Sequence, residues 1–196
     1  MQKGRLRLVK EQIRTYFERL QAAIANLDVG EIEEAVEAII AAYDREATVY
    51  IFGNGGSAAT ASHYVCDFNK GISEKRSKKF HMVCLSDNVP ELTAIANDIS
   101  YDEIYRVPLV NNLKADDLVI AISGSGNSKN VINAVEYAKE VGCKVVGITG
   151  YDGGRLRQMA DYKMHVNVDD MQLTEDIHMA FDHMMYRVLN DTLPTQ

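Results

Sequence analysis

Residues 49–67, "VYIFGNGGSAATASHYVCD", contain the clearest indication of the fold class in this sequence. An apolar run ends in a glycine loop, and a helical pattern that carries His63 and Asp67 follows the loop. A strand that turns directly into a helix is the opening unit of a parallel α/β sheet. The loop has no lysine, which argues against a nucleoside triphosphate site of the P-loop kind.

The same alternation continues to the end of the chain. Apolar, β-branched runs predict strands at 48–52, 80–85, 118–122, 144–149 and 163–168. Helical patterns lie near 57–69, 89–96, 128–141 and 153–160, and from about Glu175 to Leu193. The strands are continuously apolar, as expected when helices cover both faces of a sheet. We therefore predict a flavodoxin-like, doubly wound α/β fold with a five-stranded parallel sheet of order 2-1-3-4-5.

Residues 1–46 follow a different pattern and predict an N-terminal helical hairpin. The first helix has a heptad seam, typical of a helix that packs on other helices, made of Val9, Ile13, Tyr16, Leu20, Ala23 and Leu27. A second amphipathic helix follows "LDVG" and carries Ile32, Val36, Ile39 and Tyr43. We see no interdomain linker, and so predict one domain, 1–196, with a helical extension (1–46) and an α/β core (47–196).

The amino-acid composition limits the binding partners and the cellular compartment that we expect for this protein. A net charge of -7 over 196 residues argues against nucleic acid or an anionic membrane as a partner. No apolar run is long enough for a membrane span, and the N-terminus lacks the apolar region of a signal peptide. Three cysteines without a CxxC pair favour a reducing compartment. We expect a cytoplasmic protein.

Two glycine-serine loops follow the first and third predicted strands, "GNGGS" (53–57) and "SGSGNS" (123–128). Each leads into a helix N-terminus, where free N–H groups favour an anion. In this sheet order the loops flank the topological switch point, and we expect both to face one crevice. They predict a small phosphorylated ligand, bound by Asn54, Gly55, Gly56, Ser57, Ser123, Gly124, Ser125 and Ser128.

Other interpretations of the loops are weaker. "GNGGSA" satisfies the loose dinucleotide pattern, but the acidic Asp87 follows about 34 residues later instead of about 20. We therefore predict no nucleotide cofactor. Tight turns with helix caps alone would also produce such loops, although two serine-rich loops at one switch point favour a ligand.

Several segments resemble one family in order along the chain. They are "GNGGSAATASH" (53–63), "AIANDISYDEIY" (94–105), "SGSGNS" (123–128), "TGYDGG" (149–154) and "EDIHMAFDH" (175–183). The sequence resembles a sugar isomerase (SIS) domain and, more narrowly, the phosphoheptose isomerases, which interconvert sedoheptulose 7-phosphate and a heptose 7-phosphate. The resemblance implies a homotetramer with interfacial active sites and a phosphate held by the serine loops. It adds Asn97 and Asp98 as substrate-binding candidates, whereas Gly124 replaces a frequent hydroxyl residue.

The resemblance also implies a catalytic set. The family has His and Glu four residues apart on the helix after the first loop, and Gln and His eight apart on the last helix. The matching residues here are His63, Asp67, Glu175 and His183. The resemblance makes Asp67 and His183 the acid-base pair, and zinc, held in some members by all four groups, a candidate cofactor.

The spacing of these residues tests that assignment. His63 and Asp67 are four apart and project from one helix face. Glu175 and His183 are eight apart, about 12 Å along a helix, so one straight helix cannot bring both to one metal. Either Glu175 precedes the helix and folds back, or a neighbouring subunit supplies one of the two. Two carboxylates would neutralise Zn²⁺ better than a carboxylate and an amide.

Together with the resemblance, these residues lead us to expect an aldose–ketose isomerase that works through an enediol, with Asp67 as base and His183 as acid or second base. The shorter Asp67 also suits another sugar phosphate. A non-enzymatic relative that binds the bacterial replication initiator is a further alternative, because "DNVPELTAIAND" (87–98) resembles it equally. His178 and Asp182 fit an ordinary i,i+4 pair.

Overall fold

A computed structural model describes residues 2–195, with side chains from residue 6 onward; residues 1 and 196 of the predicted domain lie outside it. Five parallel strands form one sheet of order β2-β1-β3-β4-β5. This confirms the predicted topology. The strands are β1 (Thr48–Gly53), β2 (His81–Cys84), β3 (Leu118–Ser123), β4 (Lys144–Thr149) and β5 (Tyr162–His165).

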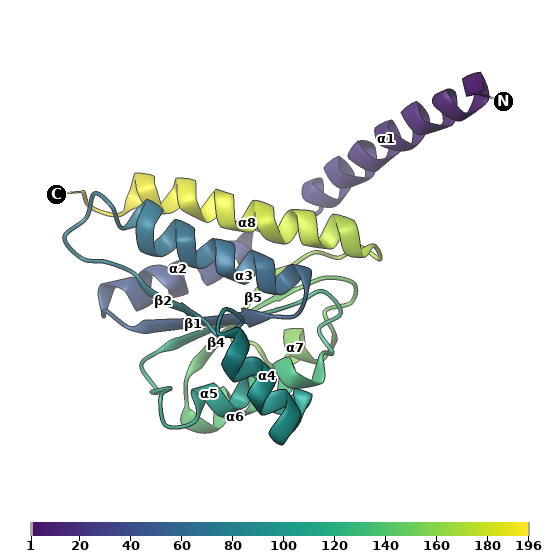
Figure 1. Ribbon diagram of the computed structural model, residues 1–196. Helices are drawn as coiled ribbons and strands as arrows, with labels where there is room; N and C mark the ends of the chain where they lie inside the picture. Colours follow the sequence, from purple (N-terminus) through teal and green to yellow (C-terminus); the bar gives the residue numbers. More distant parts are fainter. Residues whose placement is uncertain (1, 196) are drawn as a thin grey trace.

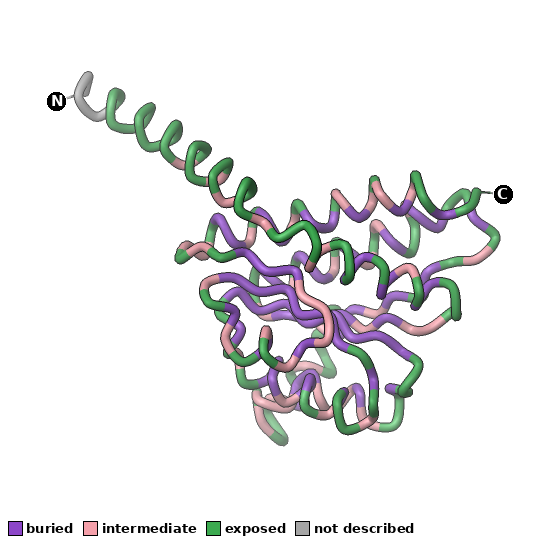
Figure 2. The backbone as a smooth tube through the Cα atoms, turned by 180° about the vertical axis from the view of Figure 1, so that it is seen from behind, coloured by how far each residue is buried: buried purple, intermediate pink, exposed green. Residues whose placement is uncertain are grey.

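Helices cover both faces of the sheet (Figure 1). One face carries α2 (Val29–Asp44), α3 (Gly56–Cys66) and α8 (Met171–Thr192). The other carries α4 (Val89–Asp98), α5 (Arg106–Leu109), α6 (Lys129–Val141) and α7 (Gly154–Met159). The central strand, β3, is buried along its whole length, and Figure 2 shows buried backbone through the middle of the sheet, because apolar side chains on both strand faces meet a helix layer.

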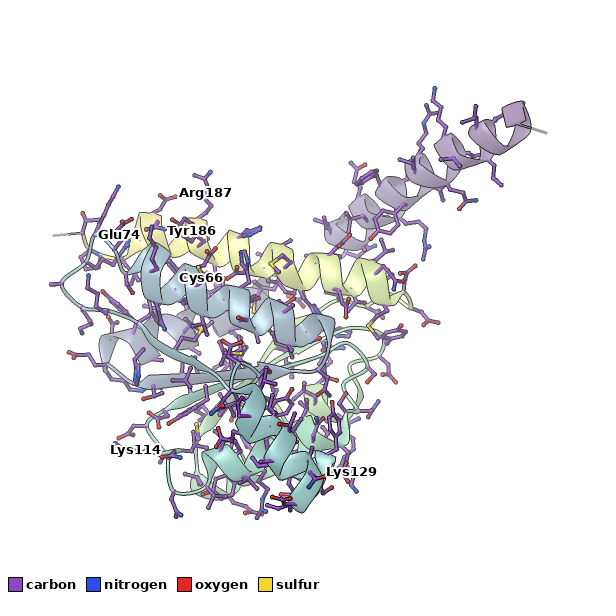
Figure 3. All side chains as sticks on the ribbon, viewed as in Figure 1. Cys66, Glu74, Lys114, Lys129, Tyr186 and Arg187 are labelled. Carbon is purple, nitrogen blue, oxygen red and sulfur yellow. The ribbon has the colours of Figure 1, made fainter. Side chains whose placement is uncertain are left out.

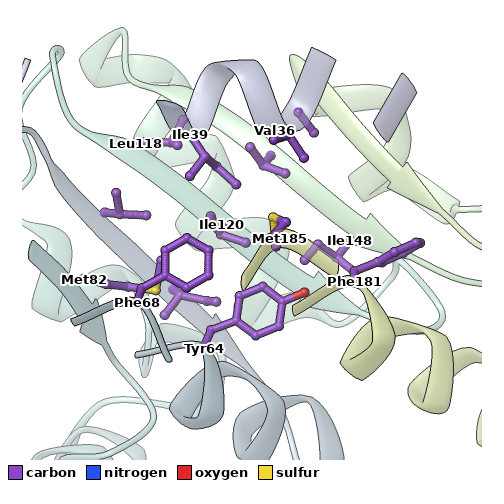
Figure 4. Close-up of a cluster of buried hydrophobic side chains, with 14 of the residues drawn as sticks. Val36, Ile39, Tyr64, Phe68, Met82, Leu118, Ile120, Ile148, Phe181 and Met185 are labelled. Carbon is purple, nitrogen blue, oxygen red and sulfur yellow. The ribbon is translucent and has the colours of Figure 1, made fainter. Parts of the chain in front are cut away.

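The larger core lies between the sheet and the helices α2, α3 and α8. Tyr64 and Phe68 from the α3 side belong to one core cluster with Phe181 and Met185 of α8 and Ile148 of β4, as Figure 4 shows. Each of these side chains is at most 3% exposed. Burying a side chain of this size stabilises the fold by about 1.5–3 kcal/mol. This packing fixes α3 against α8.

Some boundaries differ from the predictions. Helix α8 begins at Met171, four residues before the predicted Glu175, because the Asp170 side chain caps it by accepting from two backbone N–H groups. After Cys66 the first core helix continues as a π-helix, Asp67–Ile72. Strand β5 ends at His165, before the predicted end at 168. Two short helices, Tyr101–Glu103 and α5, were not predicted.

Helix α1 (Gln2–Ala25) leaves the body of the molecule (Figures 1 and 2). Its second half packs on α8, where Tyr16 donates to Asp176 at 2.5 Å and Arg19 lies 2.8 Å from Asp170. In its first half the seam residues Val9 and Ile13 are exposed. Both predicted N-terminal helices are confirmed, but α1 packs on α8 instead of folding back along α2. No helix in the described part of the chain has the length and apolar character needed to cross a membrane.

Candidate active site

Helices α3 and α8 lie side by side and run in the same direction (Figure 1). A Cβ atom added at Gly56 would lie 2.6 Å from the Glu175 carboxylate, and one at Gly71 would lie 2.5 Å from the Tyr186 ring. Between these two contacts, His63 faces Asp182. The three contacts follow in the same order along both helices, so the α3–α8 interface is a parallel one.

Four side chains of this interface form a His–Asp cluster: His63, Asp67, Asp182 and His183. Their ligand atoms all lie within 4.8 Å of one another. The Nε2 atom of His63 is 3.3 Å from Nε2 of His183, 3.6 Å from Oδ2 of Asp182 and 3.8 Å from Oδ2 of Asp67. Three predicted site residues therefore come together within one chain.

Asp67 is positioned by the change of helix type at the end of α3. It is the first residue of the π-helical turn, and its backbone N–H still bonds to the carbonyl of His63. Single π-helical turns occur often at functional sites. Because the bond from Asp67 to His63 still spans four residues, as in a regular α-helix, the predicted i,i+4 proximity of the two side chains is retained.

The sequence did not identify Asp182 as a member of the cluster. Instead of pairing with His178, its carboxylate points toward His63, and both of its oxygens lack a hydrogen-bond partner among the described residues. Burial, and then the charge of Asp67, raise the pKa of Asp182 to about 7. A signal was present: Asp182 follows Glu175 by seven residues, two helical turns, and so shares its helix face.

Glu175 does not join the cluster. It lies inside α8, so the prediction that it precedes the helix and folds back is wrong. Its carboxylate instead covers Gly56 at the amino end of α3. Eight residues of a continuous helix, about 12 Å, separate it from His183. The Glu175 carboxylate is stabilised at the amino end of α3, because free N–H groups and the helix dipole favour negative charge at a helix N-terminus.

The second glycine-serine loop leads into α6 without a side-chain capping bond from the N-cap residue of that helix. Ser123 donates to the hydroxyl of Ser128 at 3.2 Å, and Ser125 accepts from the backbone of Asn127 at 3.2 Å. Ser128, the N-cap of α6, makes no side-chain capping bond. Gly126 has a φ of +65°, and a Cβ there would overlap the Gly153 carbonyl, so only glycine fits.

The two loops lie side by side but line separate pockets. Asn54 of the first loop and Asn130 of α6 exchange amide hydrogen bonds of 2.9 and 2.8 Å across the switch point. The pocket of the first loop, about 230 Å³, is lined by Asn54 and Gly55. The pocket of the second, about 600 Å³, is lined by Ser125 and Asn127. The two loops therefore line two pockets of this chain instead of the single crevice that we predicted.

A third pocket, of about 690 Å³, opens at the His–Asp cluster. It is lined by Cys66, Asp67, Lys70, Gly71, His183, Tyr186 and Arg187. Figure 3 shows Cys66, Tyr186 and Arg187 gathered at this end of α3 and α8. The pocket thus combines cluster residues with two cationic side chains.

The remaining candidates lie away from these contacts. Asn97 and Asp98 are exposed at the end of α4 and bond to each other at 2.8 Å. Ser57 is buried at the start of α3. Substrate binding by these three residues stays a prediction.

This sheet order, with glycine-serine loops after β1 and β3, is that of a sugar isomerase (SIS) domain, and the family match identifies the class. The SIS domain profile matches residues 13–150. A "Probable phosphoheptose isomerase" of Thermoplasma acidophilum is 35% identical over 90% of this chain and 96% of its own length. The phosphoheptose isomerase of Helicobacter pylori is 31% identical over 91% of this chain and 92% of its own length. This chain therefore belongs to the SIS domain family and, within it, to the phosphoheptose isomerases.

A solved structure supports the same grouping. The phosphoheptose isomerase GmhA from Neisseria gonorrhoeae superposes with a TM-score of 0.85 at 27% identity, covering 94% of this chain and 100% of that one. Because it covers 94% of this chain, the similarity includes at least part of α8, which lies beyond the residues matched by the SIS domain profile.

Proposed function

We propose that this protein is an aldose–ketose isomerase that interconverts sedoheptulose 7-phosphate and a heptose 7-phosphate through an enediol. The observation that carries the proposal is the meeting of Asp67 and His183 in one pocket of a phosphoheptose isomerase family member. Isomerisation requires one group to remove the proton next to the carbonyl and another to move protons at the oxygens. A carboxylate and an imidazole supply both functions.

The exposure of these groups suits their roles. Asp67 is 23% exposed, so a substrate in the pocket can reach its carboxylate, which we assign as the base. His183 is exposed beside it and is assigned as the acid or second base. His63 lies between them and holds both groups near one point.

The cluster fits a zinc ion. Ligand atoms around a tetrahedral zinc at ordinary bond lengths lie about 3.3 Å apart, close to the 3.3–3.8 Å separations at Nε2 of His63. The unpartnered, buried carboxylate of Asp182 points toward the same position. We propose His63, Asp67 and His183 as ligands. When bound, zinc would polarise the substrate carbonyl. One oxygen of Asp67 would remain for proton transfer.

We assign the phosphate to the second loop. The N-cap residue of α6, Ser128, makes no capping bond, and Ser123 and Ser125 lie in the loop before it; a helix N-terminus of this kind attracts an anion. The amino end of α3 already faces the carboxylate of Glu175, which would repel a phosphate. Glu175 is therefore better suited to accept hydrogen bonds from sugar hydroxyls.

The domain organisation, assembly and compartment are part of the proposal. We propose that residues 1–196 form a single SIS domain and act as a cytoplasmic homotetramer whose active sites lie at subunit interfaces. The separate pockets of one chain and three exposed apolar side chains of α1, Val9, Ile13 and Phe17, support an assembly. Light scattering of the wild type and of Ile13→Glu measures the assembly directly. A monomeric wild type would refute it.

The chemistry is tested by proton NMR of sedoheptulose 7-phosphate in D₂O. We expect aldose signals, and deuterium on the carbon next to the carbonyl, with the wild-type protein. Asp67→Asn should abolish exchange while sugar phosphate binding changes only a few-fold. Asp191→Asn, an exposed carboxylate near the end of the same helix α8, is the control and should retain turnover. Exchange at the wild-type rate in Asp67→Asn would refute the assignment of the base.

A further inference from the structure

Asp182 is an unusual residue in the core of this protein. Its side chain is fully buried, and neither oxygen has a hydrogen-bond partner among the described residues. A carboxylate can only accept hydrogen bonds or bind a cation, and burying it without either is costly. The position therefore calls for a partner of positive charge.

The nearby side chains do not supply that partner. Within the described part of the chain, His63 is the one basic group within salt-bridge distance of Asp182. The hydroxyl of Tyr64 is engaged elsewhere, since it donates to the carbonyl of His178 at 3.0 Å. Lys70, which lines the cluster pocket, lies 3.4 Å from Glu74 and is paired there.

The geometry of the contact between Asp182 and His63 distinguishes a metal ligand from a residue that only orients the histidine. A carboxylate that only orients a metal-binding histidine bonds to the ring nitrogen that faces away from the metal. Here Oδ2 of Asp182 faces Nε2, the same nitrogen that faces His183 and Asp67. Asp182 thus points toward the centre of the cluster and does not support it from behind.

We propose that Asp182 is itself a metal ligand, which together with His63, Asp67 and His183 forms a site of two imidazoles and two carboxylates within a single chain. Four such donors suit a tetrahedral divalent transition metal, whose coordination can expand to five when the substrate carbonyl binds, and two carboxylates neutralise its charge. Glu175 is then not needed as a ligand. The inference rests on the metal-binding part of the proposed function and is independent of the identity of the sugar.

The test is cobalt binding to the metal-depleted, full-length protein, followed by visible absorption and by competition with Zn²⁺. We expect one Co²⁺ per chain with the intense absorption of four-coordinate cobalt. Asp182→Asn, which is neutral and nearly isosteric, should weaken binding on the order of 100-fold or more, beyond the loss expected for a merely orienting residue. The matched control is Glu175→Gln on the same helix face, which should bind Co²⁺ as the wild type does.

A second variant covers the case in which Asp182→Asn does not fold. Asp182→Cys keeps a ligand at this position and should add a sulfur-to-cobalt charge-transfer band, which appears only if residue 182 touches the metal. Wild-type affinity and spectrum in Asp182→Asn would overturn the proposal, as would a wild-type protein that binds no Co²⁺. Cobalt binding through residue 182 without any isomerase activity would support this inference and refute the proposed function.

Discussion

Acid should destabilise this protein through His178, a buried histidine of α8. Its side chain is 1% exposed, and neither ring nitrogen has a hydrogen-bond partner among the described residues. Burial lowers the pKa of His178 from 6.5 to about 4. Because the folded pKa is depressed, the stability linked to the neutral ring is fully present above pH 6.5 and is lost as the pH falls toward 4.

The size of the effect follows from the two pKa values. Each pH unit crossed between them costs about 1.4 kcal/mol, because the unfolded chain takes up a proton that the folded chain refuses. Lowering the pH from 7.5 to 5 crosses about one and a half units, so His178 should cost about 2 kcal/mol of unfolding free energy. Asp182, whose pKa is raised, acts in the opposite direction. The wild-type profile alone therefore mixes both effects.

The assay is urea unfolding of the wild type and of His178→Gln at both pH values, in the presence of a chelator. Asp182 is common to the two proteins and cancels in their difference, so the wild-type advantage should shrink by about 2 kcal/mol at pH 5. Met185→Ala, at an equally buried position of α8, is the control and should cost about 2–4 kcal/mol at either pH. A wild-type advantage over His178→Gln that is the same at both pH values would refute the reasoning.

Three further predictions concern other parts of the fold. Arg76→Met should cost about 3 kcal/mol in urea unfolding, because the buried guanidinium bonds to the last carbonyls of α8; an unchanged midpoint would contradict this. Burial raises the pKa of the Asp161 carboxyl, but hydrogen bonds from the ammonium groups of Lys139 and Lys144 outweigh burial and hold this pKa below its ordinary value. The stability that the Asp161 carboxylate contributes is therefore present above pH 3.8 and is lost as the pH falls through its lower folded pKa. We expect Asp161→Asn to be less stable than the wild type at pH 7 and nearly equal to it near pH 2, as measured by circular dichroism. Gly126→Ala should abolish phosphate binding in calorimetry, whereas Gly55→Ala, which has a similar positive φ but open space around it, should cost only backbone strain of about 1 kcal/mol.

The sequence predicts those parts of the structure that depend on local patterns. Continuous apolar runs and glycine-serine loops give the strands and their order, and an i,i+4 spacing gives the proximity of His63 and Asp67. Asp182 and Glu175 were misassigned because their environment depends on how α8 lies along α3. That register is set by packing between residues more than one hundred positions apart, as in the contact between Tyr64 and α8. The local seven-residue spacing shows that Asp182 and Glu175 share a helix face, but it does not show which of the two lies beside His63.

Charge balance links the metal to the substrate. Three carboxylates line the α3–α8 interface, Glu175, Asp67 and Asp182, and a substrate phosphate adds about one and a half to two further negative charges. Among the cationic side chains of the cluster pocket, Lys70 is already paired with Glu74. A divalent cation in the His–Asp cluster would offset both aspartates and leave the single charge of Glu175 facing the sugar hydroxyls. A carboxylate at position 182 thus makes one at position 175 available to the substrate, because the metal no longer needs a ligand from there.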